Sequence, residues 1–109
     1  MAKEEDDVLR VRTIEIVDGD GKVRMRLGVD EDGSAGVDLY DGDGKMRASL
    51  GVEGGGATGV DVYGADGTIR ISLGVEESGA TGLDLYTDEG DLRVSLGIDD
   101  EGRTGLDLL

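Results

Sequence analysis

Residues 36–58 read GVDLYDGDGKMRASLGVEGGGAT, and variants of this 23-residue unit occupy almost the whole chain. Four copies follow one another without a gap, and a fifth begins at Gly105 and stops at Leu109. Self-similarity with a period of about 20 to 50 residues is typical of repeat proteins, in which each unit packs on its neighbours. The sequence therefore predicts a charged N-terminal segment, residues 1–12, and one repeat domain, residues 13–109, with copies at 13–35, 36–58, 59–81 and 82–104 and a partial copy at 105–109.

Each repeat contains two short segments in which apolar and polar residues alternate, such as residues 36–40 and 46–52. Alternation with a period of two predicts β-strands that bury one face. Nine such segments predict nine strands and an all-β fold. The apolar positions are Ile14, Ile16, Val37, Leu39, Val60, Val62, Leu83, Leu85, Leu106 and Leu108 in the first segments, and Val23, Met25, Leu27, Val29, Met46, Ala48, Leu50, Val52, Ile69, Ile71, Leu73, Val75, Leu92, Val94, Leu96 and Ile98 in the second.

Glycine-containing turns predict that consecutive strands pair as antiparallel hairpins. Within a repeat, Asp-Gly dipeptides such as Asp43-Gly44 predict two-residue turns of type I′. Between repeats, an acidic residue opens the loop and a glycine closes it, as in residues 53–56, which favours a type I turn followed by a left-handed glycine. The resulting register sets tyrosine opposite arginine, aspartate opposite serine and glycine opposite glycine on the polar face, beginning with Tyr40 and Arg47.

Two other architectures remain open beside this antiparallel meander. A β-solenoid with 23 residues per coil would stack like charges, for example Asp38 on Asp61, so the meander is favoured. A closed barrel needs a stagger between strands, which two-residue turns do not supply but a four-residue loop at residues 41–44 would.

The apolar face of the predicted sheet has nothing in the chain to cover it. The strand assignments place 26 apolar side chains there, and so large an exposed patch is an aggregation liability. We therefore expect a homo-oligomeric β-prism, with three copies favoured over two. The expected interface residues are Ile14, Ile16, Met25, Leu27, Val37, Leu39, Leu50, Val60, Val62, Ile71, Leu73, Leu83, Leu85, Val94, Leu96, Leu106 and Leu108.

The composition argues against several classes of function. The chain has no His and no Cys, which removes the commonest general base and any thiolate metal site. A net charge of −15 argues against nucleic acid and anionic membranes as partners. A flat repeating face offers no pocket, so we expect no enzyme activity, no cofactor and no small-molecule substrate. No signal peptide is recognisable, which indicates synthesis in the cytoplasm; a virion component released by lysis would share this feature.

The acidic turns suggest an alternative function, as a binding module. Asp18, Asp20, Asp41 and Asp43 lie in short Asp-Gly stretches that resemble part of an EF-hand calcium loop, although Leu50 stands where the distal bidentate Glu would be. Turn formation explains the same residues, and weak Ca²⁺ binding stays open. The Tyr and Arg rows could likewise bind a glycan or a protein.

The two ends of the repeat domain differ from its middle. Alternation in residues 9–12 is out of phase with Ile14 and Ile16, which predicts a bulge or break near Arg12-Thr13. At the other end, residues 105–109 form an edge strand with little protection. We expect either a further protein segment or a partner chain beside that edge.

The tripeptide Leu39-Tyr40-Asp41 and the run GKMRASLGV at residues 44–52 are similar to repeats in uncharacterised bacterial proteins. They also resemble repeats in the shafts of trimeric phage tail fibres, over residues 13–109. This resemblance implies a homotrimeric, non-catalytic shaft or spacer and implies no functional residues. A designed, consensus-derived repeat would have the same features.

Overall fold

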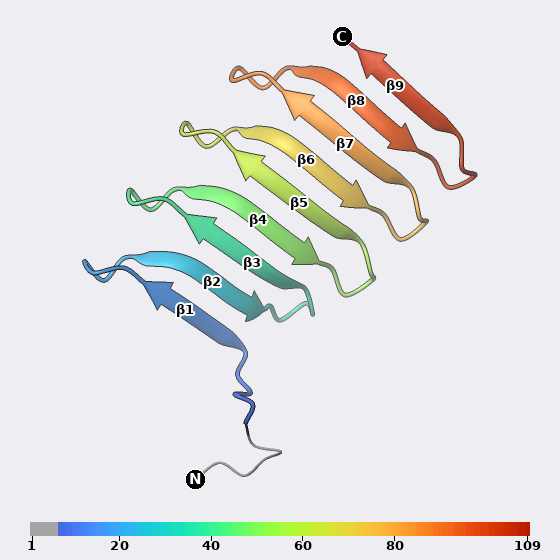
Figure 1. Ribbon diagram of the computed structural model, residues 1–109. Helices are drawn as coiled ribbons and strands as arrows, with labels where there is room; N and C mark the ends of the chain where they lie inside the picture. The colour runs from blue at the N-terminus through green and yellow to red at the C-terminus, as the bar shows by residue number, and fades with distance from the viewer. Residues whose placement is uncertain (1–6) are drawn as a thin grey trace.

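The computed structural model describes residues 7–109, which form one antiparallel sheet of nine strands in sequence order (Figure 1). The predicted all-β meander is therefore confirmed. Residues 1–6 of the predicted N-terminal segment lie outside the described residues. The strands are β1 (Thr13–Val17), β2 (Val23–Val29), β3 (Ala35–Tyr40), β4 (Met46–Val52), β5 (Thr58–Tyr63), β6 (Ile69–Val75), β7 (Thr81–Tyr86), β8 (Leu92–Ile98) and β9 (Thr104–Leu108).

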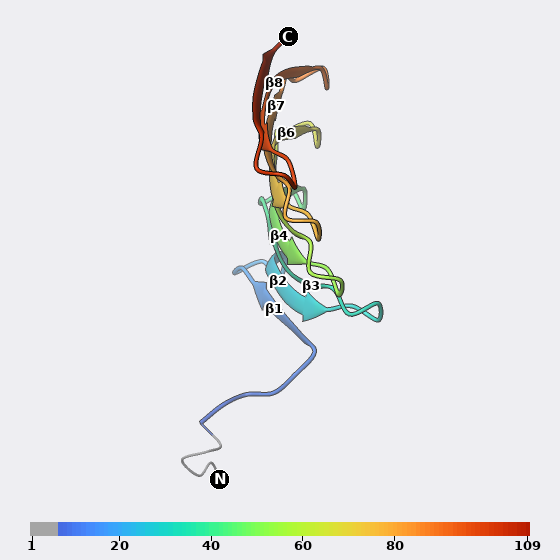
Figure 2. The same ribbon diagram turned by 90° about the vertical axis from the view of Figure 1, so that its right-hand side faces the viewer.

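The sheet is a single twisted layer that does not close on itself. Strands β1 and β9 lie at opposite ends of the strand order, and the view along the sheet shows no second layer on either side (Figure 2). Both alternative architectures, the β-solenoid and the closed barrel, are therefore wrong for residues 7–109. Within the same residues, no helix is long and apolar enough to span a membrane.

The break predicted at Arg12-Thr13 is where β1 begins. The carbonyl of Arg12 still accepts a hydrogen bond from the Val29 N–H, at 3.0 Å, but residues 7–12 form no strand. Figure 1 shows this segment leaving the sheet beyond the outer edge of β1. The change of phase in the sequence therefore marks the first strand correctly.

The loops between repeats form as predicted. In the loop from β4 to β5, the Gly56 N–H donates to the Glu53 carbonyl at 2.9 Å, and the Glu53 N–H donates to the Ala57 carbonyl at 2.8 Å. Gly56 has a φ of 105°, a left-handed conformation that glycine adopts without steric cost. The other three loops of this kind have the same pair of backbone hydrogen bonds.

The loops within repeats are not the two-residue type I′ turns predicted. A type I′ turn needs positive φ at Asp43, yet no non-glycine residue among those described has positive φ. Instead the Gly44 N–H donates to the Asp41 carbonyl at 3.0 Å, and the Asp41 N–H donates to the Lys45 carbonyl at 2.9 Å. In this loop the Asp41 side chain supports the turn, because its Oδ1 accepts the N–H groups of Asp43 and Lys45. The loop that begins at Gly64 forms the same pair of backbone hydrogen bonds without a side chain at that position. Both loop types therefore use one turn geometry.

The loop within the repeat has three residues, 42–44, instead of the predicted two, which shifts the strand register by one residue. A β-bulge in the second strand cancels this shift. The three-residue loop pairs Tyr40 with Met46, whereas the next pair is Leu39 with Ala48. Arg47 is the extra residue between them, so it does not face Tyr40 as predicted. The hairpin within each of the other three repeats has an equivalent bulge, so every repeat returns to the predicted register. No net stagger accumulates along the sheet, which is why it does not curve into a barrel.

Candidate functional site

The predicted interface residues lie on one face of the sheet. Directly paired residues in antiparallel strands point to the same face, and the pairing runs without interruption from β1 to β9. The 17 residues expected at the interface, together with Ala48, make up two complete rows. The first row is Ile14, Leu27, Val37, Leu50, Val60, Leu73, Leu83, Leu96 and Leu106, and the second is Ile16, Met25, Leu39, Ala48, Val62, Ile71, Leu85, Val94 and Leu108. We call these two rows the apolar face.

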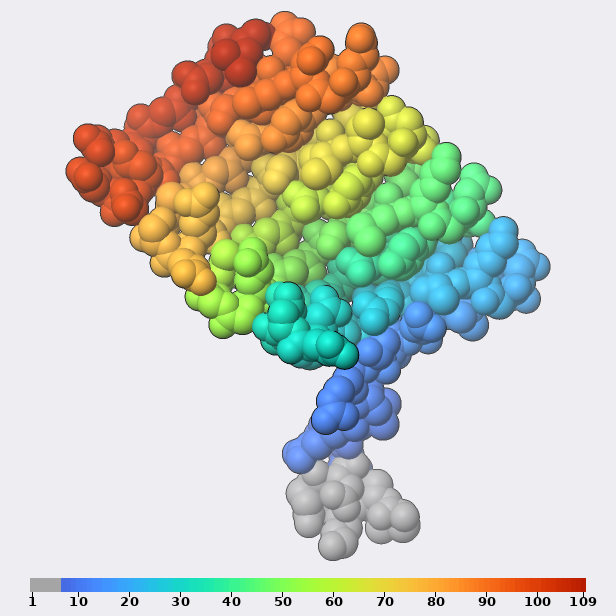
Figure 3. All heavy atoms as spheres, turned by 180° about the vertical axis from the view of Figure 1, so that it is seen from behind, coloured from blue at the N-terminus to red at the C-terminus, as the bar shows by residue number. Residues whose placement is uncertain are grey.

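The apolar face is open to solvent in a single chain. No hydrophobic residue among residues 7–109 is buried, and even in the central strands Leu50 is 46% exposed and Leu73 is 44% exposed. The view along the sheet shows one layer with no other segment of the described chain on either side (Figure 2), and the space-filling view from behind shows the strands side by side (Figure 3). The sheet of one chain therefore has no hydrophobic core of its own.

The size of this face is that of a protein–protein interface. Nine strands spaced about 4.8 Å apart, with about six residues each at roughly 3.3 Å per residue, give a face of about 800 Å². A stable interface of standard size buries about 800 Å² on each partner. The two rows contain no aromatic residue, so their side chains are all of small to medium size.

The opposite face has rows of polar residues that complement one another. One row alternates aspartate and serine across β3 to β9, and in β2 Arg26 takes the serine position between Glu15 and Asp38. The Ser49 hydroxyl donates to Asp38 Oδ1 at 2.9 Å, and Arg26 Nε lies 3.9 Å from Glu15 Oε2. The predicted cross-strand role of serine is therefore confirmed at Ser49.

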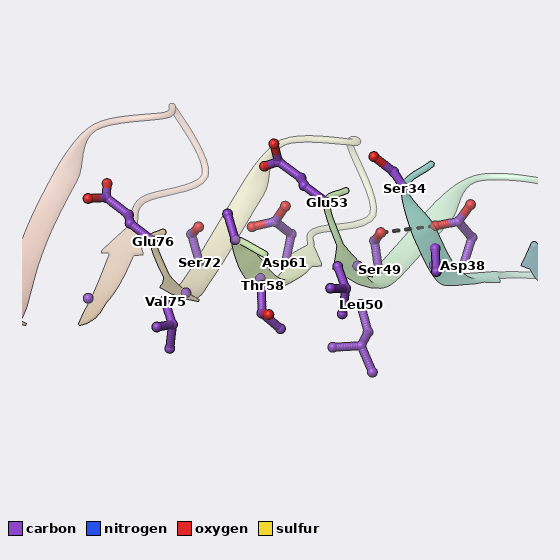
Figure 4. A pocket seen from close by; sticks show the side chains of 18 of the residues that line it. Ser34, Asp38, Ser49, Leu50, Glu53, Thr58, Asp61, Ser72, Val75 and Glu76 are labelled. Atoms are coloured by element: carbon purple, nitrogen blue, oxygen red, sulfur yellow. Dashed lines mark hydrogen bonds between the residues drawn. The ribbon is translucent and has the colours of Figure 1, made fainter. Parts of the chain in front are cut away.

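A second row on this face begins with Thr13 in β1 and is glycine in every later strand, at positions 28, 36, 51, 59, 74, 82, 97 and 105. Next to the row of carboxylates it leaves a shallow groove of about 590 Å³. Figure 4 shows Asp38, Asp61, Glu53 and Glu76 on one side of the sheet and Val75 on the other. The groove is therefore acidic, and its floor is backbone.

The arginines at the bulges connect neighbouring repeats. Arg47, the unpaired residue of the bulge in β4, donates from Nε to the Tyr63 carbonyl of β5 at 3.0 Å. Its Nη1 lies 3.7 Å from Asp41 Oδ2 in the preceding turn. Lys45 Nζ also donates to the Ala65 carbonyl of the next turn, at 3.2 Å. These contacts hold the hairpins in register along the rim of the sheet, a role that the sequence interpretation missed.

Several titratable groups on the polar side have shifted pKa values. Hydrogen bonds from the backbone N–H groups of Lys45 and Asp43, with the charge of Arg47, lower the pKa of Asp41 below its ordinary value. Partial burial raises the pKa of the Tyr63 phenol, and the neighbouring carboxylates raise it further. The shifts reflect turn formation and crowding of carboxylates, and none arises from the apolar face.

The calcium candidates divide into two kinds. Asp18 and Asp41 use Oδ1 to accept N–H groups of their own turns. Asp20 and Asp43 are exposed and contribute their N–H groups to the same turns. Within residues 7–109, no three His, Cys, Asp or Glu side chains are arranged to hold one metal ion. Weak Ca²⁺ binding stays a prediction, which calorimetry at millimolar Ca²⁺ tests directly.

Comparison with protein families and with curated proteins assigns the chain to no known group. No protein-family model matches it, and no curated protein matches it. The similarity to tail-fibre shafts therefore stays an expectation from the repeat motif. The functional interpretation rests on the two faces and the edges of the sheet.

Proposed function

We propose that this chain is a non-catalytic structural module that self-associates through its apolar face into a rigid rod or prism. The carrying observation is that the two rows of aliphatic side chains span all nine strands while no hydrophobic residue in residues 7–109 is buried. Burying apolar surface is the main favourable term in protein association. A second copy of the same face supplies a surface of matching size and chemistry.

Three copies are favoured over two because the face is narrow and its side chains are small to medium. A prism of three sheets with the apolar faces inward encloses a thin core that Val, Leu and Ile fill without aromatic residues. The acidic polar faces then all point outward, and their charge keeps the particles apart in solution. The module would serve as a shaft, spacer or scaffold.

Sedimentation equilibrium tests this proposal. The chain has a mass of 11.3 kDa, and we expect a particle that contains several chains at micromolar concentration. Substituting Leu73 with lysine should reduce the number of chains. A particle of one chain, with the sheet intact by circular dichroism, would overturn the proposal.

A further inference from the structure

The free edges of the sheet are not equivalent, and their backbone groups can be assigned from the hydrogen bonds. The Leu109 N–H donates to the Arg93 carbonyl, and the Asp99 N–H donates to the Arg103 carbonyl, each at 2.8 Å. Bonding alternates along an antiparallel strand, so Gly105 and Asp107 also face β8. The N–H and C=O groups of Thr104, Leu106 and Leu108 therefore point away from the sheet.

On this basis we propose that β9 pairs with β9 of a second copy, antiparallel and about a two-fold axis at Leu106. Leu106 then pairs with Leu106 of the second copy, and Thr104 pairs with Leu108 of the second copy. Three such pairs form in this register, and each exchanges two N–H···O bonds. No other antiparallel register forms more pairs between the outward-facing residues.

The side chains suit this pairing on both faces. Thr104, Leu106 and Leu108 belong to the apolar side, so the rows of the two copies join into one continuous face. On the polar side Asp107 lies opposite Gly105 of the second copy, which has open space where a side chain would be. The two Asp107 carboxylates are then diagonal neighbours and not direct ones.

The edge at β1 does not suit the same contact. The Arg12 carbonyl bonds to Val29, so alternation makes Thr13, Glu15 and Val17 the outward-facing residues. The register with most pairs would set Glu15 directly opposite Glu15 of the second copy, and like charges in that position are unfavourable. Residues 7–12 also extend past this edge (Figure 1).

Pairing β9 antiparallel with β1 of another copy fails for a different reason. Outward-facing residues of β9 have side chains on the apolar side, whereas those of β1 have side chains on the polar side. Paired residues must share a face, so this contact would set Leu106 beside Glu15 and turn one apolar face over. Parallel pairing with β1 would keep the faces together, but it is less stable per residue.

Proline at Thr104 tests the proposal, because the Thr104 N–H points away from β8 and takes part in two of the three proposed pairs. Proline is tolerated on an edge strand when the lost N–H faces outward. Thr104 lies outside the two rows of the apolar face, so the substitution leaves that face intact. We expect wild-type particles to contain twice as many chains as those of Thr104→Pro. Thr104→Ala loses the hydroxyl but keeps the N–H, so it should match the wild type. Glu15→Pro blocks the other edge and should also match the wild type.

This factor of two is independent of the proposed function. If the apolar faces did not associate, the wild type would contain two chains and Thr104→Pro one, whereas Leu73→Lys reports on the faces. Equal masses for the wild type and Thr104→Pro would overturn the edge pairing. A halved mass for Thr104→Ala or Glu15→Pro would do the same.

A distance measurement guards against misfolding of the proline variant. The chain has no Cys, so Arg103→Cys provides a single spin-labelling site on an exposed side chain. In the proposed register the two Cα atoms at position 103 lie about 20 Å apart. We expect a population of spin pairs near that distance in the labelled protein, retained with Thr104→Ala and lost with Thr104→Pro. Absence of this population in the labelled protein would overturn the proposal.

Discussion

The two faces of the sheet differ in how far the contacts within a single chain stabilise them. On the polar face, Ser49 bonds to Asp38, Arg47 bonds to the Tyr63 carbonyl, and glycine lies against glycine. On the apolar face, Leu50 is 46% exposed, and no hydrophobic residue among residues 7–109 is buried. The same register builds both faces, so register alone does not make a stable protein. The hairpins order the strands, and the apolar side chains still need a second surface.

Lysine at two adjacent positions separates the faces most strongly. Leu73→Lys places a charge in the first row of the apolar face, where association would leave it unpaired at a cost of several kcal/mol. Ser72→Lys places the same charge between Asp61 and Asp84. We expect Leu73→Lys to weaken self-association by at least about a hundredfold, which corresponds to roughly 2.8 kcal/mol.

Ser72→Lys is the matched control, because it changes net charge by the same amount. It reproduces the arrangement of Arg26 between Glu15 and Asp38. We expect it to associate as the wild type does and to unfold at the same or a slightly higher temperature. Analytical ultracentrifugation of the two variants decides the matter. Dissociation caused by Ser72→Lys and not by Leu73→Lys would assign the interface to the polar face.

Alanine in the glycine row tests how closely the polar side of the sheet is packed. A Cβ at Gly74 would lie 3.1 Å from the Thr58 carbonyl oxygen, whereas a Cβ at its partner Gly59 would lie 3.6 Å from the Leu73 carbonyl oxygen. Alanine also restricts the unfolded chain, which favours folding by about 0.4–1 kcal/mol where the site is open. We expect Gly74→Ala to be about 1 kcal/mol less stable than Gly59→Ala by denaturant unfolding. Equal stabilities of the two variants would mean that the backbone near Gly74 adjusts to the added methyl group without cost.

Acid should act on the polar side and leave the apolar rows unchanged, since those rows contain no titratable group. The pKa of Asp41 lies below its ordinary 3.8 in the folded chain, chiefly because of the Lys45 N–H. Its stabilising contribution is complete above the ordinary pKa and is lost as pH falls through the lower folded value. Asp41→Asn keeps an acceptor oxygen but does not titrate.

The expected result is a small loss of melting temperature in the wild type relative to Asp41→Asn between neutral pH and about pH 2. The comparison with the variant removes the general effect of neutralising a chain whose net charge is −15. Thermal unfolding followed by circular dichroism measures it. A difference between the two proteins that does not change with pH would contradict the assigned role of the Asp41 carboxylate.

The side-chain rows on both faces could be predicted from the sequence. The alternation of apolar and polar residues and the 23-residue period of the repeat together determine the strand register. A slip of one residue at Val37 would turn every side chain of that strand to the other face, so the aliphatic pattern admits one register. The complementary order of Asp38, Ser49 and Asp61 then follows without further assumption. The absence of stagger, and hence the open sheet, follows from the 23-residue repeat of that register.

The turn and the bulge could not be predicted in the same way. The longer loop and the bulge each shift the strand register by one residue, in opposite directions, so together they leave the predicted register unchanged. A two-residue loop without a bulge and a three-residue loop with one give the same pairing at Leu39 and Ala48. The signal was present in the spacing of Asp41 and Gly44, which matches the spacing of Glu53 and Gly56 in the other loops. Reading both loops by one rule would have found the turn, and the bulge then follows from the register.

Because the strand register returns to its starting point every 23 residues, the number of repeats determines the length of the sheet. Each added hairpin lengthens the sheet by about 9.6 Å, two strand spacings, and leaves the width of its faces unchanged. It also rotates the end of the sheet by roughly 40–50°, because each strand contributes about 20–25° of twist. Gain or loss of whole repeats would thus change the length of the rod, and the angle between its two ends, in fixed steps.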